Sequence, residues 1–154
     1  MRNRLGKGVA MQRVKVLLVD DDARFLKWFR QFLTSETALE IAGEAGDGQE
    51  AIRKATELQP DVVLMDVRMP GMTGLEITQH LKAEMPNLTV ILLSIFDLRE
   101  YHDAAMASGA SAFLPKRDVQ TRLRSLLCTL GCIPSSETDS DFLGESSTRT
   151  GEGG

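Results

Sequence analysis

The chain has 154 residues, enough for one domain with a sizeable core but too few for two domains of ordinary size. It is 42% hydrophobic and 26% charged, and no apolar run approaches the roughly 20 residues that a membrane helix needs. The net charge of −4 argues against a general nucleic-acid-binding surface. We therefore expect a globular, cytoplasmic protein with no membrane attachment.

Short apolar runs alternate with amphipathic segments along most of the chain. The runs are typical of strands buried on both faces, and we expect strands at 14–19, 39–45, 61–65, 88–93 and 111–114. Each is followed by apolar residues at helical spacing, as in Phe25, Phe29 and Phe32. Proline or glycine ends these helices, for example Pro60 and Gly131.

Strict alternation of five strands with five helices predicts an α/β fold. Each right-handed crossover lays a helix over one face, so the expected fold is a doubly wound parallel sheet. We assign residues 14–131 to this single domain. Residues 1–13 form a basic leader and 132–154 a tail rich in Ser, Thr, Gly and acidic residues, and we expect both to be disordered.

Polar residues follow the expected strands directly. Doubly wound sheets bind ligands beyond the carboxyl ends of their strands, so these residues are the candidate site. They are Asp20, Asp21 and Asp22 after the first strand, Asp66 after the third, Ser94 after the fourth and Lys116 after the fifth.

Three crowded carboxylates indicate a site for a hard divalent cation. Asp20, Asp21 and Asp66 would repel one another without a cation, and oxygen ligands in a water-accessible cleft suit Mg²⁺. Taken alone, a strand-end Asp is more often a turn or capping residue, and we assign that role to Asp22 as N-cap of the first helix.

The lysine and the serine need a further explanation, which phosphoryl transfer supplies. A carboxylate can act as a nucleophile and form an aspartyl phosphate, which makes Asp66 the candidate acceptor. Lys116 would then supply positive charge to the transferred oxygens and Ser94 a hydrogen bond.

The motifs VLLVDDD, GEAGDGQEAI, PDVVLMDVRMPGMTGLE, ILLS and GASAFLPK resemble the receiver domain of bacterial two-component response regulators, in particular the LuxR/NarL-like subfamily. The resemblance implies the flavodoxin-like strand order 2-1-3-4-5. It implies Asp66 as phosphoacceptor, Lys116 and Ser94 as its helpers, and Ser94 with Phe113 as the switch pair. It also implies Mg²⁺ bound by Asp20, Asp21, Asp66 and the backbone carbonyl of Arg68.

The same resemblance implies partners. A sensor histidine kinase would supply the phosphoryl group, and the fourth helix, fifth strand and fifth helix would change and control transcription or a partner protein. We expect a homodimer through that surface or through the first and fifth helices. We expect residues 132–154 to contain no output domain, and therefore expect no DNA contact by this chain itself, although a fragment of a longer regulator could reach DNA through an output domain.

Two alternatives stay open at this point. A phosphohydrolase with an Asp nucleophile usually carries a second Asp two residues later, where this chain has Arg68, so we expect no enzyme. A pseudo-receiver that works without phosphate is disfavoured by the complete acidic pair, Asp66 and Lys116. Ile95 and Phe96 keep this alternative open, because their bulk could narrow access to the phosphoryl pocket for small phosphodonors.

Overall fold

The computed structural model describes residues 12–134. The predicted leader, apart from its last two residues, and the predicted tail beyond Pro134 lie outside the described residues. The elements in chain order are β1 (Val14–Val19), α1 (Ala23–Thr34), β2 (Leu39–Ala45), α2 (Gly48–Leu58), β3 (Val62–Asp66), α3 (Gly74–Glu84), β4 (Thr89–Ser94), α4 (Arg99–Ala107), β5 (Ala112–Pro115), the short 3₁₀ helix η1 (Lys116–Asp118) and α5 (Val119–Thr129).

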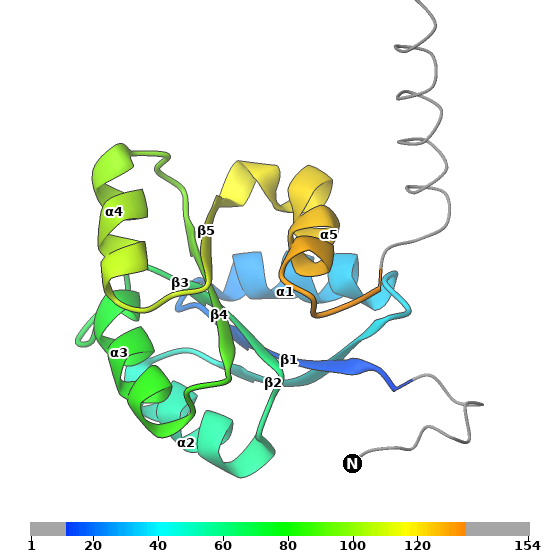
Figure 1. Ribbon diagram of the computed structural model, residues 1–154, viewed down its shortest axis with the longest axis horizontal. Coiled ribbons are helices and arrows are strands. Elements are labelled where there is room, and N and C mark those ends of the chain that lie inside the picture. Colours follow the sequence, from blue (N-terminus) through cyan, green and yellow to red (C-terminus); the bar gives the residue numbers. More distant parts are fainter. Residues whose placement is uncertain (1–11, 135–154) are drawn as a thin grey trace, which may run out of the picture.

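The five strands form one parallel sheet in the order β2-β1-β3-β4-β5. The predicted doubly wound α/β fold and its strand order are therefore confirmed. Strand order reverses at β1 and β3, which lie side by side at the middle of the sheet (Figure 1). Their carboxyl ends are thus placed where such folds bind ligands.

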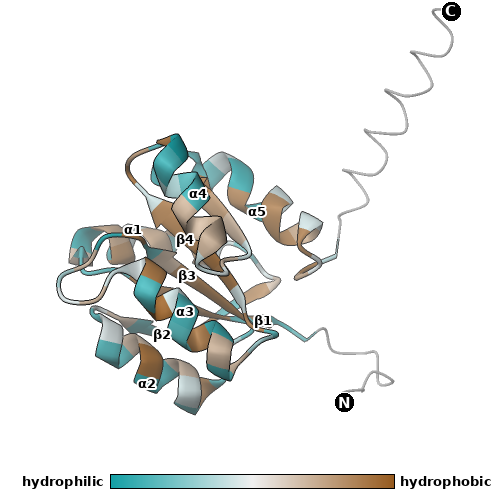
Figure 2. Ribbon diagram, turned by 60° about the vertical axis from the view of Figure 1, so that its left-hand side comes forward, coloured by the Kyte–Doolittle hydropathy of each residue, from teal (hydrophilic) through white to brown (hydrophobic). Residues whose placement is uncertain are grey.

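Two apolar clusters hold the helices against the sheet. Alternate residues of one strand enter different clusters, because successive strand side chains point to opposite faces. In β1, Val16 and Leu18 pack with α1 and α5, whereas Leu17 and Val19 pack with α2, α3 and α4. The central strands are apolar on both faces for this reason, and they lie between helices of mixed hydropathy (Figure 2).

Side-chain hydrogen bonds cap the N-terminal ends of the first three helices. Asp22 accepts hydrogen bonds from the backbone N–H of Arg24 and Phe25, so the prediction that it caps α1 is confirmed. Asp47 caps α2, and Thr73 caps α3 in a reciprocal capping box. Among the described helices, α4 and α5 begin without a side-chain cap, and residue Leu98 stands at the N-cap of α4.

The packed unit reaches slightly beyond residues 14–131. Arg13 donates hydrogen bonds to the backbone carbonyls of Thr37 and Leu39, and Ile133 is buried against the α1–α5 cluster. Within residues 12–134, no helix has the length and apolarity required to cross a membrane.

Candidate functional site

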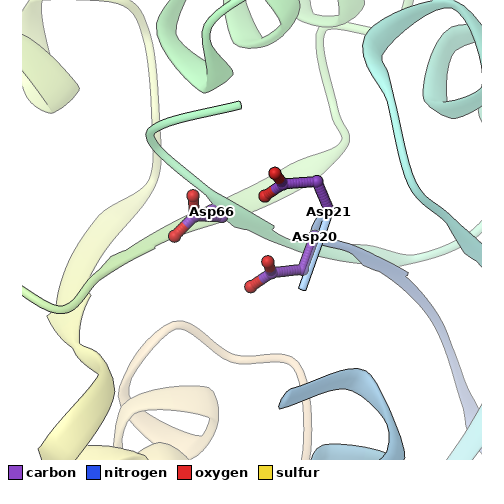
Figure 3. Close-up of side chains that lie close together, drawn as sticks. All are labelled: Asp20, Asp21 and Asp66. Carbon is purple, nitrogen blue, oxygen red and sulfur yellow. The ribbon is translucent and has the colours of Figure 1, made fainter. Parts of the chain in front are cut away.

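Three carboxylates meet at the carboxyl ends of β1 and β3. Asp20 and Asp21 follow β1, Asp66 ends β3, and one oxygen from each lies within 4.8 Å of the others (Figure 3). Asp20 and Asp66 are buried, whereas Asp21 is exposed. The structure therefore brings together the acidic residues that the sequence predicted.

Backbone groups hold the two buried carboxylates in place. The N–H of Arg68 donates to Oδ2 of Asp66 over 3.0 Å, and the N–H of Asp22 donates to Oδ1 of Asp20 over 2.9 Å. Behind Asp66, a Cβ on Gly74 would lie 2.3 Å from the Asp66 carbonyl oxygen, so only glycine fits at that position. The backbone of Asp66, at the end of β3, thus packs directly against the start of α3.

Lys116 forms ion pairs with the carboxylates at the ends of β1 and β3. Its Nζ lies 2.6 Å from Oδ2 of Asp20 and 3.1 Å from Oδ1 of Asp66, and its side chain is only 12% exposed. The residue follows β5 directly, at the start of η1. The ammonium is therefore positioned beside the candidate acceptor, as the sequence predicted.

Burial and charge act in opposite directions on these groups. Burial raises the pKa of Asp66 to about 6, the charge of Lys116 opposes that rise, and the charge of Asp20 adds to it. For Lys116, burial alone would lower the pKa, but the hydrogen bond with Asp20 and the charge of Asp66 outweigh it and raise the pKa. Lys116 is therefore a permanent cation at neutral pH.

The donor set suits Mg²⁺. It consists of oxygens alone, and the three carboxylates with one ammonium leave about two negative charges when all are ionised. A hard divalent cation would balance that charge and relieve the repulsion that contributes to the raised pKa of Asp66.

The remaining predicted residues lie around this centre. Ser94 ends β4 with its Oγ buried, and that oxygen accepts a hydrogen bond of 3.0 Å from the N–H of Phe96. Phe113 in β5 is buried at 8% exposure. The Arg68 guanidinium lies over the Phe96 ring, 5.7 Å from its centroid.

Sequence reasoning missed three contacts that involve the site. Phe25, interpreted only as part of an apolar stripe, lies with its ring 4.1 Å from Nζ of Lys116. His102 packs on Phe113 with ring centroids 4.2 Å apart and is hydrogen-bonded to Asp97. The close approach of Gly74 was also missed. None has a spacing signal in the sequence, because each depends on residues from separate elements.

A doubly wound 2-1-3-4-5 sheet with an acidic cluster and a lysine at its strand ends defines a receiver-type domain. The chain belongs to the response regulator receiver domain family, whose model matches residues 16–127.

Individual relatives agree with this assignment. The chain is 36% identical over 104 residues to the transcriptional regulatory protein YxjL of Bacillus subtilis, covering 68% of this chain and 48% of YxjL. Among solved structures, the signal receiver domain of NarL from Mycobacterium tuberculosis is 28% identical with a TM-score of 0.72, covering 77% of this chain and 96% of that chain. The predicted likeness to the LuxR/NarL type is therefore confirmed.

A second solved structure is the CheX–CheY complex of Borrelia burgdorferi with BeF₃⁻ and Mg²⁺, 26% identical with a TM-score of 0.72 over 77% of this chain and 90% of that chain. The chain spans about half the length of the first curated relatives it matches. The family assignment therefore covers the receiver part that these proteins share.

Proposed function

We propose that this chain is the phosphoacceptor of a two-component system, phosphorylated on Asp66 by a sensor histidine kinase. The observation that carries the proposal is the buried Asp66 carboxylate, held by a backbone N–H on one side and 3.1 Å from the Lys116 ammonium on the other. A nucleophile fixed beside a cation is what phosphoryl transfer requires of a protein.

In the proposed reaction, an oxygen of Asp66 attacks the phosphorus of a phosphohistidine in line with the leaving nitrogen. Lys116 then moves part of its hydrogen bonding to a phosphoryl oxygen, where it offsets the developing charge. Asp20, Asp21, Asp66 and the Arg68 carbonyl would hold Mg²⁺, which supplies further positive charge to the equatorial oxygens when bound. The Ser94 hydroxyl would donate to a second phosphoryl oxygen.

The product differs from the resting chain mainly in charge. The phosphoryl group carries up to about two negative charges in place of the single charge of the ionised carboxylate, and it brings three acceptor oxygens beside β4. Turning Ser94 toward them would break its contact with the N–H of Phe96, at the start of the loop that leads to α4. We propose that α4, β5 and α5 change together as a result, with Phe113 as the second member of the switch.

The proposed function involves further partners. We propose homodimerisation through α4-β5-α5 or α1 and α5, a cytoplasmic location, and control of transcription only through an output domain on a longer chain. We propose a phosphoacceptor and no independent enzyme, since the position two residues after Asp66 holds Arg68 in place of a general acid.

Intact-mass spectrometry after incubation with acetyl phosphate and Mg²⁺ tests the proposal. We expect one adduct of about 80 Da on the wild type, lost at alkaline pH and absent from Asp66→Asn. Asp47→Asn is the control, because Asp47 is another aspartate just beyond the carboxyl end of a strand, where it caps α2, but it lies outside the acidic cluster.

A second donor separates the alternatives. If acetyl phosphate fails and a histidine kinase succeeds, Phe96 and Ile95 restrict small donors while the proposed function stands. If neither donor modifies Asp66, the chain acts without phosphate and the proposal is wrong. Continuous release of phosphate from a phosphomonoester would instead indicate a hydrolase.

A further inference from the structure

The Lys116 ammonium has a third neighbour besides its two carboxylates. The centroid of the Phe25 ring lies 4.1 Å from Nζ, within the distance at which a cation is attracted to the negative face of an aromatic ring. An ammonium has three N–H donors, and the carboxylates of Asp20 and Asp66 account for two of them. The ring therefore stands where a third partner is needed.

The position of Phe25 is fixed by its own surroundings. Its backbone N–H donates to Oδ1 of the cap residue Asp22 over 3.3 Å, which fixes the first turn of α1. Its ring contacts Phe29 and Trp28, with centroids 5.1 and 5.8 Å away, and Phe29 is anchored in the core at 1% exposure. The ring is thus held by the helix and does not depend on Lys116 for its orientation.

Phe25 and Lys116 also border the same solvent-filled hollow. It has a volume of about 380 Å³, lies between α1 and the start of α5, and its rim includes Trp28 and Ile95. A smaller side chain at position 25 would widen this hollow beside Lys116 and expose more of the ammonium to water. Hydration would weaken the attraction of Lys116 for a phosphoryl oxygen, because electrostatic interactions are weaker in water.

We propose that Phe25 is a positioning residue that holds the Lys116 ammonium toward Asp66 during phosphoryl transfer, through a cation–π contact. The inference rests on the proposed function of Asp66. An aromatic face suits this role because it attracts a cation without carrying a charge of its own. A third carboxylate would compete with the incoming phosphoryl oxygens for Lys116, whereas the ring leaves the positive charge available to them.

A series of fluorinated phenylalanines at position 25 tests the electrostatic part of the contact. Each added fluorine withdraws electron density from the ring face and changes the shape of the ring little. We expect the rate of Asp66 phosphorylation at saturating acetyl phosphate and Mg²⁺ to fall stepwise with the number of fluorines, by about threefold to tenfold in total. Circular dichroism confirms that each variant is folded.

Replacement of Phe25 by standard amino acids provides a second comparison of phosphorylation rates. Phe25→Leu should lose a similar factor, and Phe25→Tyr, which keeps the aromatic face, should restore most of the lost rate. Phe32→Leu is the control, because Phe32 belongs to the same aromatic stripe of α1 and stacks on Trp28 without a cation–π contact to Lys116. It should leave the rate unchanged.

Two results would overturn the proposal. Equal rates across the fluorine series, with a slow Phe25→Leu variant, would mean that the ring acts by shape alone. Equal rates in Phe25→Leu and the wild type would mean that it has no role.

A readout independent of phosphorylation separates this inference from the proposed function. A ring stacked on the ammonium moves the NMR signals of the Lys116 ε-methylene upfield, and Phe25→Leu should abolish that displacement. If the wild type accepts no phosphoryl group, the proposed function fails while this signal still decides the contact. If the signal is the same in both proteins, the contact is absent.

Discussion

Asp66 is the residue in which burial and function conflict most directly. Its side chain is about 10% exposed, and burial raises its pKa to about 6, so ionisation at neutral pH has a cost in the folded state. The adjacent Lys116 offsets this cost only in part. The ionised form of the candidate nucleophile is thus less favourable than that of an ordinary surface carboxylate.

This conflict predicts the pH dependence of stability. A folded-state pKa of about 6 lies above the usual 3.8, so the contribution of Asp66 to stability is complete below pH 3.8 and is lost as the pH rises through 6. In Mg²⁺-free buffer at pH 7.5, Asp66→Asn should therefore be more stable than the wild type by about 3 kcal/mol, since each unit of the pKa rise corresponds to about 1.4 kcal/mol. Urea unfolding from pH 3.5 to 8 should show this advantage shrinking as the pH falls.

Asp103→Asn is the control for that measurement, because Asp103 is exposed on α4. If Asp66→Asn were less stable than the wild type at pH 7.5, the attraction of Lys116 would outweigh burial, and the assigned direction of the pKa would be wrong.

Gly71 and Gly74, between β3 and the first turn of α3, are required for different reasons. Gly71 has a φ of 85° and open space where a Cβ would stand, whereas a Cβ on Gly74 would collide with the Asp66 carbonyl oxygen. Gly74→Ala should cost about 3 kcal/mol and displace Asp66, abolishing its phosphorylation. Gly71→Ala should cost about 1 kcal/mol through backbone strain alone and keep phosphorylation. Thermal unfolding measures the loss of stability, and intact mass measures phosphorylation. Equal losses of phosphorylation in the two variants would contradict the role of the Gly74 contact in positioning Asp66.

At the scale of elements, the helices differ in how firmly they begin. Asp22, Asp47 and Thr73 cap α1, α2 and α3, whereas α4 follows Leu98, which offers no side-chain acceptor. The loop before α4 is held instead by side chains: Asp97 pairs with both His102 and Arg117. The helix that we propose to move in the switch therefore has a weakly fixed start.

A cap introduced at Leu98 tests this difference. The residue already has extended backbone angles, with φ −109° and ψ 142°, so a serine can accept from the first turn without rearrangement. Leu98→Ser should stabilise the fold by about 1 kcal/mol relative to Leu98→Ala, and should slow amide hydrogen exchange in α4. Equal stability of the two variants would mean that the first backbone N–H groups of α4 already have other hydrogen-bond partners.

At the scale of the whole molecule, the elements were far easier to predict than the contacts between them. The runs at Val14 and Val62 are apolar without alternation, which is typical of strands covered on both faces, and this property indicated the sheet and the alternation of helices. Asp20, Asp66 and Lys116 could be grouped because parallel strands end at one edge.

Contacts across elements could not be obtained in this way. The ring of Phe25 meets Lys116 because α1 and η1 lie on the same side of the sheet, and the spacing of apolar residues in α1 does not report which side chains it meets. The pairing of His102 with Asp97, likewise, depends on the path of the loop before α4.

Metal binding should stabilise the whole domain by mass action. Mg²⁺ at 100 times its dissociation constant should raise the free energy of unfolding by about 2.7 kcal/mol, and a chelator should reverse the effect. Asp21→Asn should abolish this gain with little direct effect on the fold, since Asp21 is exposed. Asp22→Asn should keep it, because asparagine caps a helix as well as aspartate does. Thermal melts with and without Mg²⁺ measure the difference, and an equal gain in both variants would exclude Asp21 as a ligand.

The hydrogen bond between Lys116 and Asp20 joins residues 96 positions apart in the sequence. During synthesis, the three carboxylates leave the ribosome well before the lysine does, and they remain without that cation until β5 has been made and has docked beside β4. A nascent or prematurely terminated chain that ends before β5 would thus carry Asp66 in an incomplete site. Under the proposed function, only chains that contain a docked β5 would have the complete set of charged groups that phosphorylation of Asp66 requires.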